Sequence, residues 1–268
     1  MSIGLILVGC SDATQLIINT PTTVLPTLTA TTTISWFPAT STRTPLPTLL
    51  DTPTPEILPG LSDLLFSDHF NQPTLWDLSP SDGSSSIISG NRLTMSIPGG
   101  ANQVNLTSLR KDPILNDFYA SIAVHLSLCK AKDQYNLLFR LTSNMDFYRF
   151  SAACTGEVRL ERVVAGKPFV IKDWLTSPDA PLGAPGEVKL GVWASGRDLR
   201  FYLNDHFQFS VNDGTFPQGS LGVSIRPDSQ DSMTVGFSNL DVYTLEPLLD
   251  TPSPPTTLTA TPSRTPVH

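Results

Sequence analysis

Two glutamates on one predicted strand come nearest to a hydrolytic arrangement in this chain. Glu157 and Glu161, in GEVRLERV, fall on the same face of an extended segment. Four residues of strand separate them by roughly 13 Å, whereas the carboxylate pair that hydrolyses a glycosidic bond needs roughly 5 to 9.5 Å. The spacing therefore favours a solvent-facing strand flanked by arginines over a catalytic pair.

Other catalytic patterns are absent from the sequence. It has no His-Glu-x-x-His, no Gly-x-Ser-x-Gly, no Cys-x-x-Cys and no glycine-rich phosphate loop. The histidines, which lack the spacing of zinc ligands, are His69, His125, His206 and His268. We therefore predict no catalytic residue and treat enzymatic activity as the weaker hypothesis.

One aspartate is a candidate for a structural calcium ion, the only cofactor that the sequence suggests. Asp68, together with Asp82 or Asp231, could supply the oxygen ligands that Ca²⁺ prefers. Aspartates in such stretches more commonly form turns, which is the alternative interpretation.

Aromatic and arginine side chains on predicted strands form the candidate binding site. In EVKLGVWASG, Val188, Leu190 and Val192 would face the core, which turns Trp193 to the opposite face. Such rings could stack on the apolar faces of sugars, with hydrogen bonds at the edges. The predicted ligand-binding residues are Trp193, Tyr202, Arg140, Arg200 and Trp174. The alternative is that Trp193 and Tyr202 cover the sandwich under a loop.

Strands are the elements that must position these side chains. YASIAVHLSL alternates from Ala120 to Leu128, and in YNLLFRL the side chains predicted to share one face are Tyr135, Leu137, Phe139 and Leu141. Similar runs are DFYRFSAAC, EVRLERVV, LRFYLND, HFQFSVND, SLGVSI and MTVGFSNLDVY. No 3.6-residue period persists for three turns. We predict an all-β fold, an antiparallel jelly-roll sandwich.

The sandwich occupies only part of the chain. Between residues 20 and 55, 14 Thr and 7 Pro fill 21 of 36 positions, and the last residues repeat this bias. Such segments cannot build a packed core. We predict a disordered Thr/Pro-rich tether at 11–60, the sandwich at 61–247 and a disordered tail at 248–268.

The charge of the predicted sandwich argues against nucleic acid as a partner. Residues 61–247 contain 15 Lys and Arg against 16 Asp and 4 Glu, a net charge of −5. A mildly acidic domain without a basic run is a poor binder of phosphate backbones. We expect a monomer whose partner is a polysaccharide or a cell-surface protein.

Three segments resemble concanavalin A-like jelly-roll domains. LLFSDHFNQPTLWDL is similar to their opening strand, and NLLFRLTSNMDFYRFSAACTGEVRLERVVAGKPFVIKDW resembles paired strands of family-16-glycosidase-like and 3-keto-disaccharide-hydrolase-like modules. VKLGVWASGRDLRFYLNDHFQFSVND resembles a laminin-G-type ending. The family-16 motif Glu-x-Asp-x-x-Glu is missing, so the resemblance implies the fold more than any activity.

The first ten residues resemble the end of a bacterial lipoprotein signal. LVGC matches the lipobox, in which Cys10 is lipidated and becomes the mature N-terminus. No Lys or Arg precedes the short apolar run, although secretory signals carry a positive region there. We therefore expect a truncated signal at 1–10, a natural start upstream of Met1, and an extracytoplasmic, lipid-anchored protein at the cell surface or envelope.

The other two cysteines lie within the predicted sandwich. Cys129 and Cys154 end different strands, and an exported protein favours their pairing as a disulfide. Two free buried thiols are the alternative.

Three functions remain open from the sequence. The first is a lipid-anchored module that binds carbohydrate or a surface partner without catalysis. The others are a glycan-active hydrolase of the 3-keto-disaccharide hydrolase type and a structural envelope lipoprotein.

Overall fold

The computed structural model describes residues 58–78, 83–100, 105–228 and 230–246. All of them belong to one compact unit, Pro53–His268. The predicted lipobox with Cys10, the tail at 248–268 and most of the tether at 11–60 lie outside the described residues. Within the described ranges, the 3-10 helix Pro73–Leu75 is the only helix, and it is far too short to cross a bilayer.

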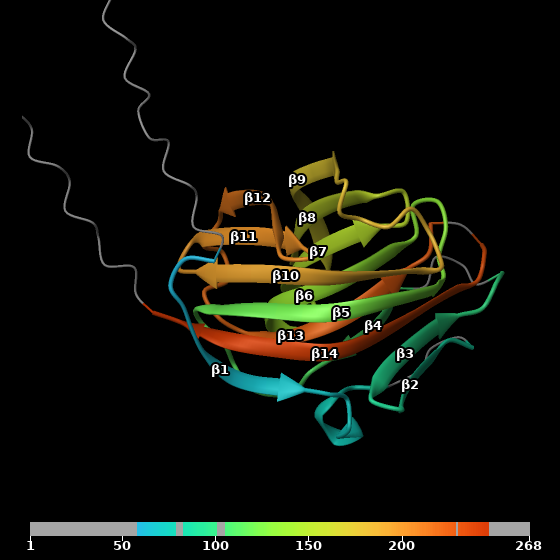
Figure 1. Ribbon diagram of the computed structural model, residues 1–268, viewed down its shortest axis with the longest axis horizontal. Helices are drawn as coiled ribbons and strands as arrows, with labels where there is room; N and C mark the ends of the chain where they lie inside the picture. Colours follow the sequence, from blue (N-terminus) through green and yellow to red (C-terminus); the bar gives the residue numbers. More distant parts are fainter. Residues whose placement is uncertain (1–57, 79–82, 101–104, 229, 247–268) are drawn as a thin grey trace, which may run out of the picture. The chain divides into compact units, whose positions relative to one another are not determined.

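The described chain folds into two antiparallel sheets packed face to face, with β5, β10 and β14 in front of β6, β7 and β8 in the view of Figure 1. The eight-stranded sheet has the order β12-β11-β10-β5-β14-β3-β2, and β1 pairs with β14. The six-stranded sheet has the order β4-β13-β6-β7-β8-β9. This architecture confirms the predicted all-β antiparallel sandwich.

The strands of the eight-stranded sheet are β1 (Leu61–Asp68), β2 (Ser85–Ser89), β3 (Arg92–Ile97), β5 (Phe118–Leu128), β10 (Gly186–Ser195), β11 (Asp198–Leu203), β12 (His206–Asn212) and β14 (Met233–Leu245). Those of the six-stranded sheet are β4 (Leu106–Leu109), β6 (Gln134–Ser143), β7 (Asp146–Ala153), β8 (Glu157–Val164), β9 (Lys167–Thr176) and β13 (Ser220–Arg226).

Alternation along each strand builds the core between the sheets. On β5, Ala120, Ile122, Val124 and Leu126 are buried, whereas Leu128 at the strand end is 52% exposed. Trp76 is also in this core. The large apolar area removed from water is what holds the two layers together.

A β-bulge in β6 breaks the predicted alternation. Tyr135, Leu137 and Phe139 enter the core, but Arg140 has a left-handed φ of 50° and the pairing shifts there. Leu141 consequently packs on the outer face with Leu138, so its predicted inward position is wrong. Gly219 makes the bulge possible, because a Cβ there would overlap the backbone of Arg140 and Leu141.

Both ends of the described chain lie at the eight-stranded sheet. The N–H of Glu246 donates to the carbonyl of Gly60 at 2.7 Å, next to the pairing of β1 with β14. The outer face of the six-stranded sheet is therefore on the opposite side of the sandwich from the sheet where the chain enters and leaves.

Candidate functional site

The aromatic side chains predicted to bind ligand face outward but are covered. Trp193 and Tyr202 pack with Tyr119 on the outer face of the eight-stranded sheet, and the exposed fractions of Trp193 and Tyr202 are 1% and 0%. Leu58 and Leu245 pack on this cluster, and the Trp193 Nε1–H donates to the carbonyl of Pro59 at 2.9 Å. We call these three rings the covered aromatic cluster.

The covered aromatic cluster corrects the predicted binding platform. The guanidinium of Arg200 lies 4.8 Å from the centroid of the Trp193 ring and closes one side of the cluster. Burial raises the pKa of Tyr202, as expected for a ring that water does not reach. The alternative interpretation, in which Trp193 and Tyr202 cover the sandwich, is the one that the structure supports.

Arg140 is a structural residue rather than a ligand. The bulge turns its side chain into the interior, where it is fully buried and lies 3.6 Å from Asp117. Its Nη atoms donate to the carbonyls of Gly196, Phe216 and Asn116 at 2.8 to 3.1 Å. Burial lowers the pKa of this guanidinium. Arg140 thus ties β6 to the turn between β10 and β11 and to two loops that connect the sheets, β4–β5 and β12–β13.

A row of polar side chains crosses five adjacent strands on the outer face of the six-stranded sheet. Its members are paired in register and alternate with core residues along their strands. This polar row consists of Thr107 on β4, Ser224 on β13, Asn136 on β6, Ser151 on β7 and Arg159 on β8. No sequence motif marks it, because its residues come from five separate segments.

Three atoms of the polar row have no hydrogen-bond partner among the residues that the structure describes. Asn136 donates from Nδ2 to the carbonyl and the hydroxyl of Ser224 at 3.1 and 3.0 Å, which leaves its Oδ1 unpaired. The Ser151 hydroxyl and the Arg159 Nε–H are likewise buried without a hydrogen bond in the described protein. Buried polar atoms are normally satisfied by protein, water or ligand. Asn136, Ser151 and Ser224 are 0% exposed, so the row is a polar layer beneath the surface of this face rather than part of the open surface.

An arginine–glutamate–arginine network lies beside the polar row. Glu161 accepts from Arg149 Nε at 2.9 Å and is also paired with Arg149 Nη2, while its other oxygen pairs with Arg159 at 3.0 Å. Glu161 is 5% exposed, so the predicted solvent-facing environment is wrong for it. Glu157 instead pairs with Lys132 at 3.5 Å. Both oxygens of Glu161 are occupied, which argues against a free acid or base.

Trp174 is the one predicted aromatic ligand residue that lies at this face. It is half-buried on the edge strand β9, with Arg159 Cζ and Lys132 Nζ 5.5 and 5.7 Å from its ring centroid. These cation–π contacts hold the ring beside the end of the polar row. The structure therefore keeps Trp174 and removes Trp193, Tyr202 and Arg140 from the candidate site.

A hollow of about 290 Å³ opens on the same face. Its lining combines guanidinium, amide and apolar side chains: Asn105, Asn144, Phe147, Arg149, Val163, Gly166, Pro168 and Arg226. We define the candidate site as this hollow together with the polar row, Glu161 and Trp174. It offers hydrogen-bond donors and acceptors, a positive charge and an aromatic ring, a combination typical of binding sites for polar ligands.

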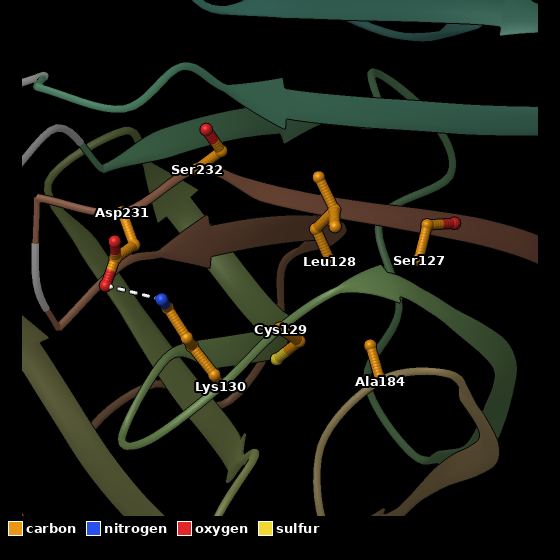
Figure 2. A pocket seen from close by; sticks show the side chains of 7 residues that line it. All are labelled: Ser127, Leu128, Cys129, Lys130, Ala184, Asp231 and Ser232. Carbon is orange, nitrogen blue, oxygen red and sulfur yellow. Dashed lines mark ion pairs between the residues drawn. The ribbon is translucent and has the colours of Figure 1, made fainter.

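A second hollow, of about 470 Å³, lies where β5 ends, at the rim of the eight-stranded sheet. Figure 2 shows Lys130 and Asp231 pointing toward each other across it, at 2.9 Å. Its other side chains are small or apolar, among them Ser127, Leu128 and Ala184. Its two charged side chains pair with each other and no aromatic ring lines it, so this hollow provides fewer groups that could bind a ligand than the candidate site does.

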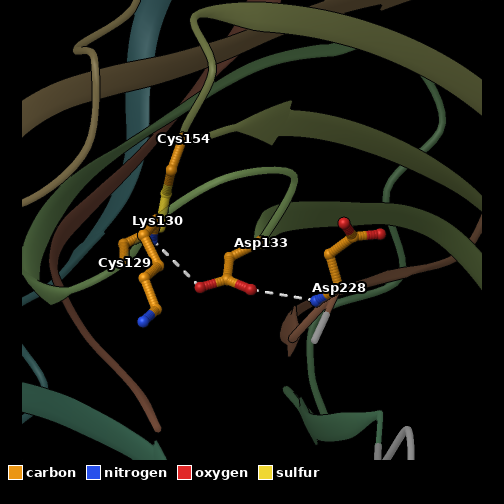
Figure 3. Close-up of a disulfide and its surroundings, with 5 residues drawn as sticks. All are labelled: Cys129, Lys130, Asp133, Cys154 and Asp228. Carbon is orange, nitrogen blue, oxygen red and sulfur yellow. Dashed lines mark hydrogen bonds between the residues drawn. A yellow bond between two sulfur atoms is a disulfide. The ribbon is translucent and has the colours of Figure 1, made fainter. Parts of the chain in front are cut away.

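Beside this hollow, Cys129 and Cys154 form the predicted disulfide. The bond joins the end of β5 to the end of β7 and thereby links the two sheets (Figure 3). Asp133 accepts from the backbone N–H groups of Lys130 and Asp228 at 3.0 and 2.9 Å, which fixes the adjoining loops. Closing a loop of this length stabilises a fold by about 3 kcal/mol in the chain-entropy model.

The surroundings of Asp68 do not fit a calcium site. Its Oδ1 accepts from the Phe70 N–H at 2.8 Å, and its Oδ2 accepts from Trp76 Nε1 and Arg110 Nε at 3.1 and 3.0 Å. Of its predicted partners, Asp82 lies outside the described residues and Asp231 pairs with Lys130. Among residues with defined positions, no three His, Cys, Asp or Glu side chains gather closely enough to hold a metal ion.

His125 belongs to an arrangement that sequence reasoning missed. Its Nδ1 lies 2.8 Å from Glu187 Oε1 and its Nε2 lies 2.8 Å from the Ser238 hydroxyl, the order found in nucleophilic triads. However, Ser238 is 7% exposed, and the adjacent hollow of about 220 Å³ is lined by His125 and Glu187 but not by Ser238. We interpret the three residues as a hydrogen-bond network across β10, β5 and β14.

Comparisons with known proteins identify the fold but no family. Neither a protein-family model nor a curated protein matches the chain. The carbohydrate binding module CBM66 from Bacillus subtilis is similar in structure, with a TM-score of 0.51 and 17% identity over 63% of this chain and 96% of that one. A protein of unknown function with a galectin-like fold, also from B. subtilis, has a TM-score of 0.50 and 12% identity over 69% and 97%.

A catalytic domain shares the same architecture. The endo-1,3-beta-glucanase (laminarinase) from Thermotoga petrophila RKU-1 has a TM-score of 0.51 and 10% identity, covering 69% of this chain and 98% of that one. These likenesses confirm the predicted concanavalin A-like jelly-roll fold. They do not choose between binding and catalysis, because the same fold serves both.

Proposed function

We propose that this protein binds carbohydrate at the candidate site without catalysing a reaction on it. The observation that carries the proposal is the open hollow, whose amide and guanidinium side chains lie on the same face of the sheet as the ring of Trp174. Sugar hydroxyls pair with such groups, and the apolar face of a sugar ring stacks on tryptophan. The fold shared with a carbohydrate binding module supports the same conclusion.

The proposed location is the outer surface of a cell envelope, with lipid on Cys10 as the membrane anchor and the Thr/Pro-rich tether as a spacer. Both ends of the described sandwich lie at the eight-stranded sheet. The opposite sheet, which carries the candidate site, can therefore face away from the attachment. We further propose a monomer with one disulfide. Incorporation of labelled fatty acid into the wild type but not into Cys10→Ser tests the anchor.

A glycan array followed by calorimetry with the full chain tests the binding. We expect at least one oligosaccharide class to bind, and Trp174→Ala to weaken that binding about tenfold through loss of stacking. Phe169→Ala is the matched control, because Phe169 also lies on β9 and is 49% exposed, but it packs against Arg162, which lies outside the candidate site. Its affinity should stay within twofold of the wild type.

Three results would overturn this function. Equal loss of affinity in Trp174→Ala and Phe169→Ala would place the ligand elsewhere. Release of reducing sugar by the wild type, abolished by Glu161→Gln in a protein that still folds, would replace binding by catalysis. A chain that binds no saccharide on the array would favour the structural envelope hypothesis.

A further inference from the structure

The candidate site is positively charged although the domain is acidic. Arg149, Arg159 and Arg226 share this face with Glu161, whereas residues 61–247 carry a net charge of −5. The nearby Lys132 and Glu157 neutralise each other. One carboxylate therefore balances only one of three guanidinium groups, and the site has an excess of about two positive charges.

The three arginines differ in how many of their guanidinium nitrogens already pair with a carboxylate. Arg149 places Nε and Nη2 on one oxygen of Glu161, and Arg159 places Nη2 on the other. The remaining Nη1 of each has no partner in the described chain. Arg226, which lines the hollow with Arg149, forms no ion pair or hydrogen bond with any residue that the structure describes.

Two acids near Arg226, Asp133 and Asp228, form no ion pair with it. Asp133, next to the residue that pairs with Arg226 across β6 and β13, accepts from two backbone N–H groups instead. Asp228 lies two residues beyond Arg226 and makes no ion pair with it within 4 Å. A partly buried positive charge without a counter-ion is costly, so the site is electrostatically incomplete until an anion enters.

We propose that the ligand is an anionic saccharide, whose carboxylate or sulfate is held by Arg226 and Arg149. A guanidinium matches the planar, multidentate geometry of both anions. In this arrangement Asn105 and Asn144, which line the hollow with both arginines, would hydrogen-bond the sugar hydroxyls, and Trp174 would contact a ring face. This inference rests on the proposed carbohydrate binding at the same site and specifies its substrate class.

Matched pairs of polysaccharides test the inference with the full chain. Polygalacturonate is compared with its fully methyl-esterified form, which lacks the carboxylate charge. Chondroitin sulfate is compared with desulfated chondroitin and with carboxyl-reduced chondroitin, so that the effects of sulfate and carboxylate are measured separately. We expect the anionic member of at least one pair to bind tenfold or more tightly. Its affinity should also fall by about tenfold between 50 and 300 mM salt.

Arg226→Gln identifies the residue responsible. It should reduce the preference for the anionic member to less than threefold, whereas Arg92→Gln should leave that preference at the wild-type value. Arg92→Gln is the control, because Arg92 is an exposed arginine on β3 of the other sheet and its loss changes the net charge equally. An equal effect of both variants would overturn the inference, since it would show long-range attraction only.

The remaining outcomes separate this inference from the proposed function. Equal binding of anionic and neutral members, still weakened by Trp174→Ala, overturns the anionic preference and leaves carbohydrate binding standing. Binding of neither member of any pair, together with a negative glycan array, overturns both. Thermal unfolding of Arg226→Gln at the wild-type temperature confirms that lost affinity does not reflect lost folding.

Discussion

The two outer faces of the sandwich differ in whether another segment of the chain covers them. On the eight-stranded sheet, Trp193 and Tyr202 point outward, but Leu58, Pro59 and the end of β14 close over them. On the six-stranded sheet, polar and arginine side chains meet beside a hollow of about 290 Å³. An outward-facing aromatic residue is thus a ligand candidate only where no segment of its own chain packs on it.

The energetic roles of the two faces follow from this difference. Apolar area that is removed from water contributes to folding, so the covered aromatic cluster stabilises the sandwich. The candidate site instead keeps polar atoms unpaired and charges in excess, which costs stability and is typical of functional positions. Replacing the tryptophan of each face tests this division, and the disulfide and Asp213 test the framework that both faces share.

Trp193→Ala should lower the free energy of unfolding by about 3 to 5 kcal/mol. The substitution leaves a cavity beside Tyr119 and removes the donor to the Pro59 carbonyl. Denaturant unfolding followed by circular dichroism measures the change. A loss below 1 kcal/mol would contradict the assignment of this cluster to the framework.

Replacing Cys129 and Cys154 together by alanine should cost about 3 kcal/mol, because the disulfide restricts the unfolded chain. The bond connects the end of β5 to the end of β7, so the double variant loses the covalent link between the two sheets. Urea unfolding under oxidising conditions compares the free energy of unfolding of the double variant with that of the wild type. The wild type with its disulfide reduced should have the same free energy of unfolding as the variant.

Acid should weaken the sandwich through Asp213. Burial raises the pKa of this carboxyl, but hydrogen bonds from Tyr148 and Thr215 and the charge of Arg162 outweigh burial and lower the pKa. A depressed folded pKa gives stability that is complete above the unfolded pKa of about 3.9 and is lost as the pH falls. Asp213→Asn should therefore show a shallower loss of melting temperature between pH 5 and pH 3 than the wild type.

Trp174→Ala should have the smallest effect on folding, below about 1 kcal/mol, because the ring is half-buried at an edge strand and its contacts are cation–π pairs. Calorimetric unfolding of Trp174→Ala and Trp193→Ala compares directly how much the tryptophan of each outer face stabilises the fold. If the two tryptophans destabilised the protein equally when replaced, the outer faces would not differ in role.

Much of the fold could be predicted from local patterns. Two-residue alternation located most of the long strands, and it correctly placed Trp193 and Tyr202 on the side away from the core. The strands β2, β3, β4 and β9 were not predicted individually. Serine-rich runs hide the alternation in β2, and the two-residue turn Gly90–Asn91, with φ of 57° and 59°, is the signal that could have revealed the hairpin.

The candidate site was less accessible to sequence reasoning. Asn136, Ser151 and Ser224 are visible as polar residues at alternate positions in apolar strands, but nothing local says that they lie in one row. Strand order and register decide that, through pairings between residues up to 88 positions apart. The bulge at Arg140 shows the same limit, since one extra residue turned a predicted ligand into a buried structural link.

The sequence by itself predicted the β-sandwich class, the two cysteines that pair and, for most of the long strands, the side that meets the core. Those properties depend on neighbours along the chain, where a period of two controls burial. Tertiary structure alone decided which outward side chains are open. Exposure depends on whether a distant segment, such as Leu58–Gly60 over Trp193, finds enough apolar surface to pack on, and alternation within a strand carries no information about that.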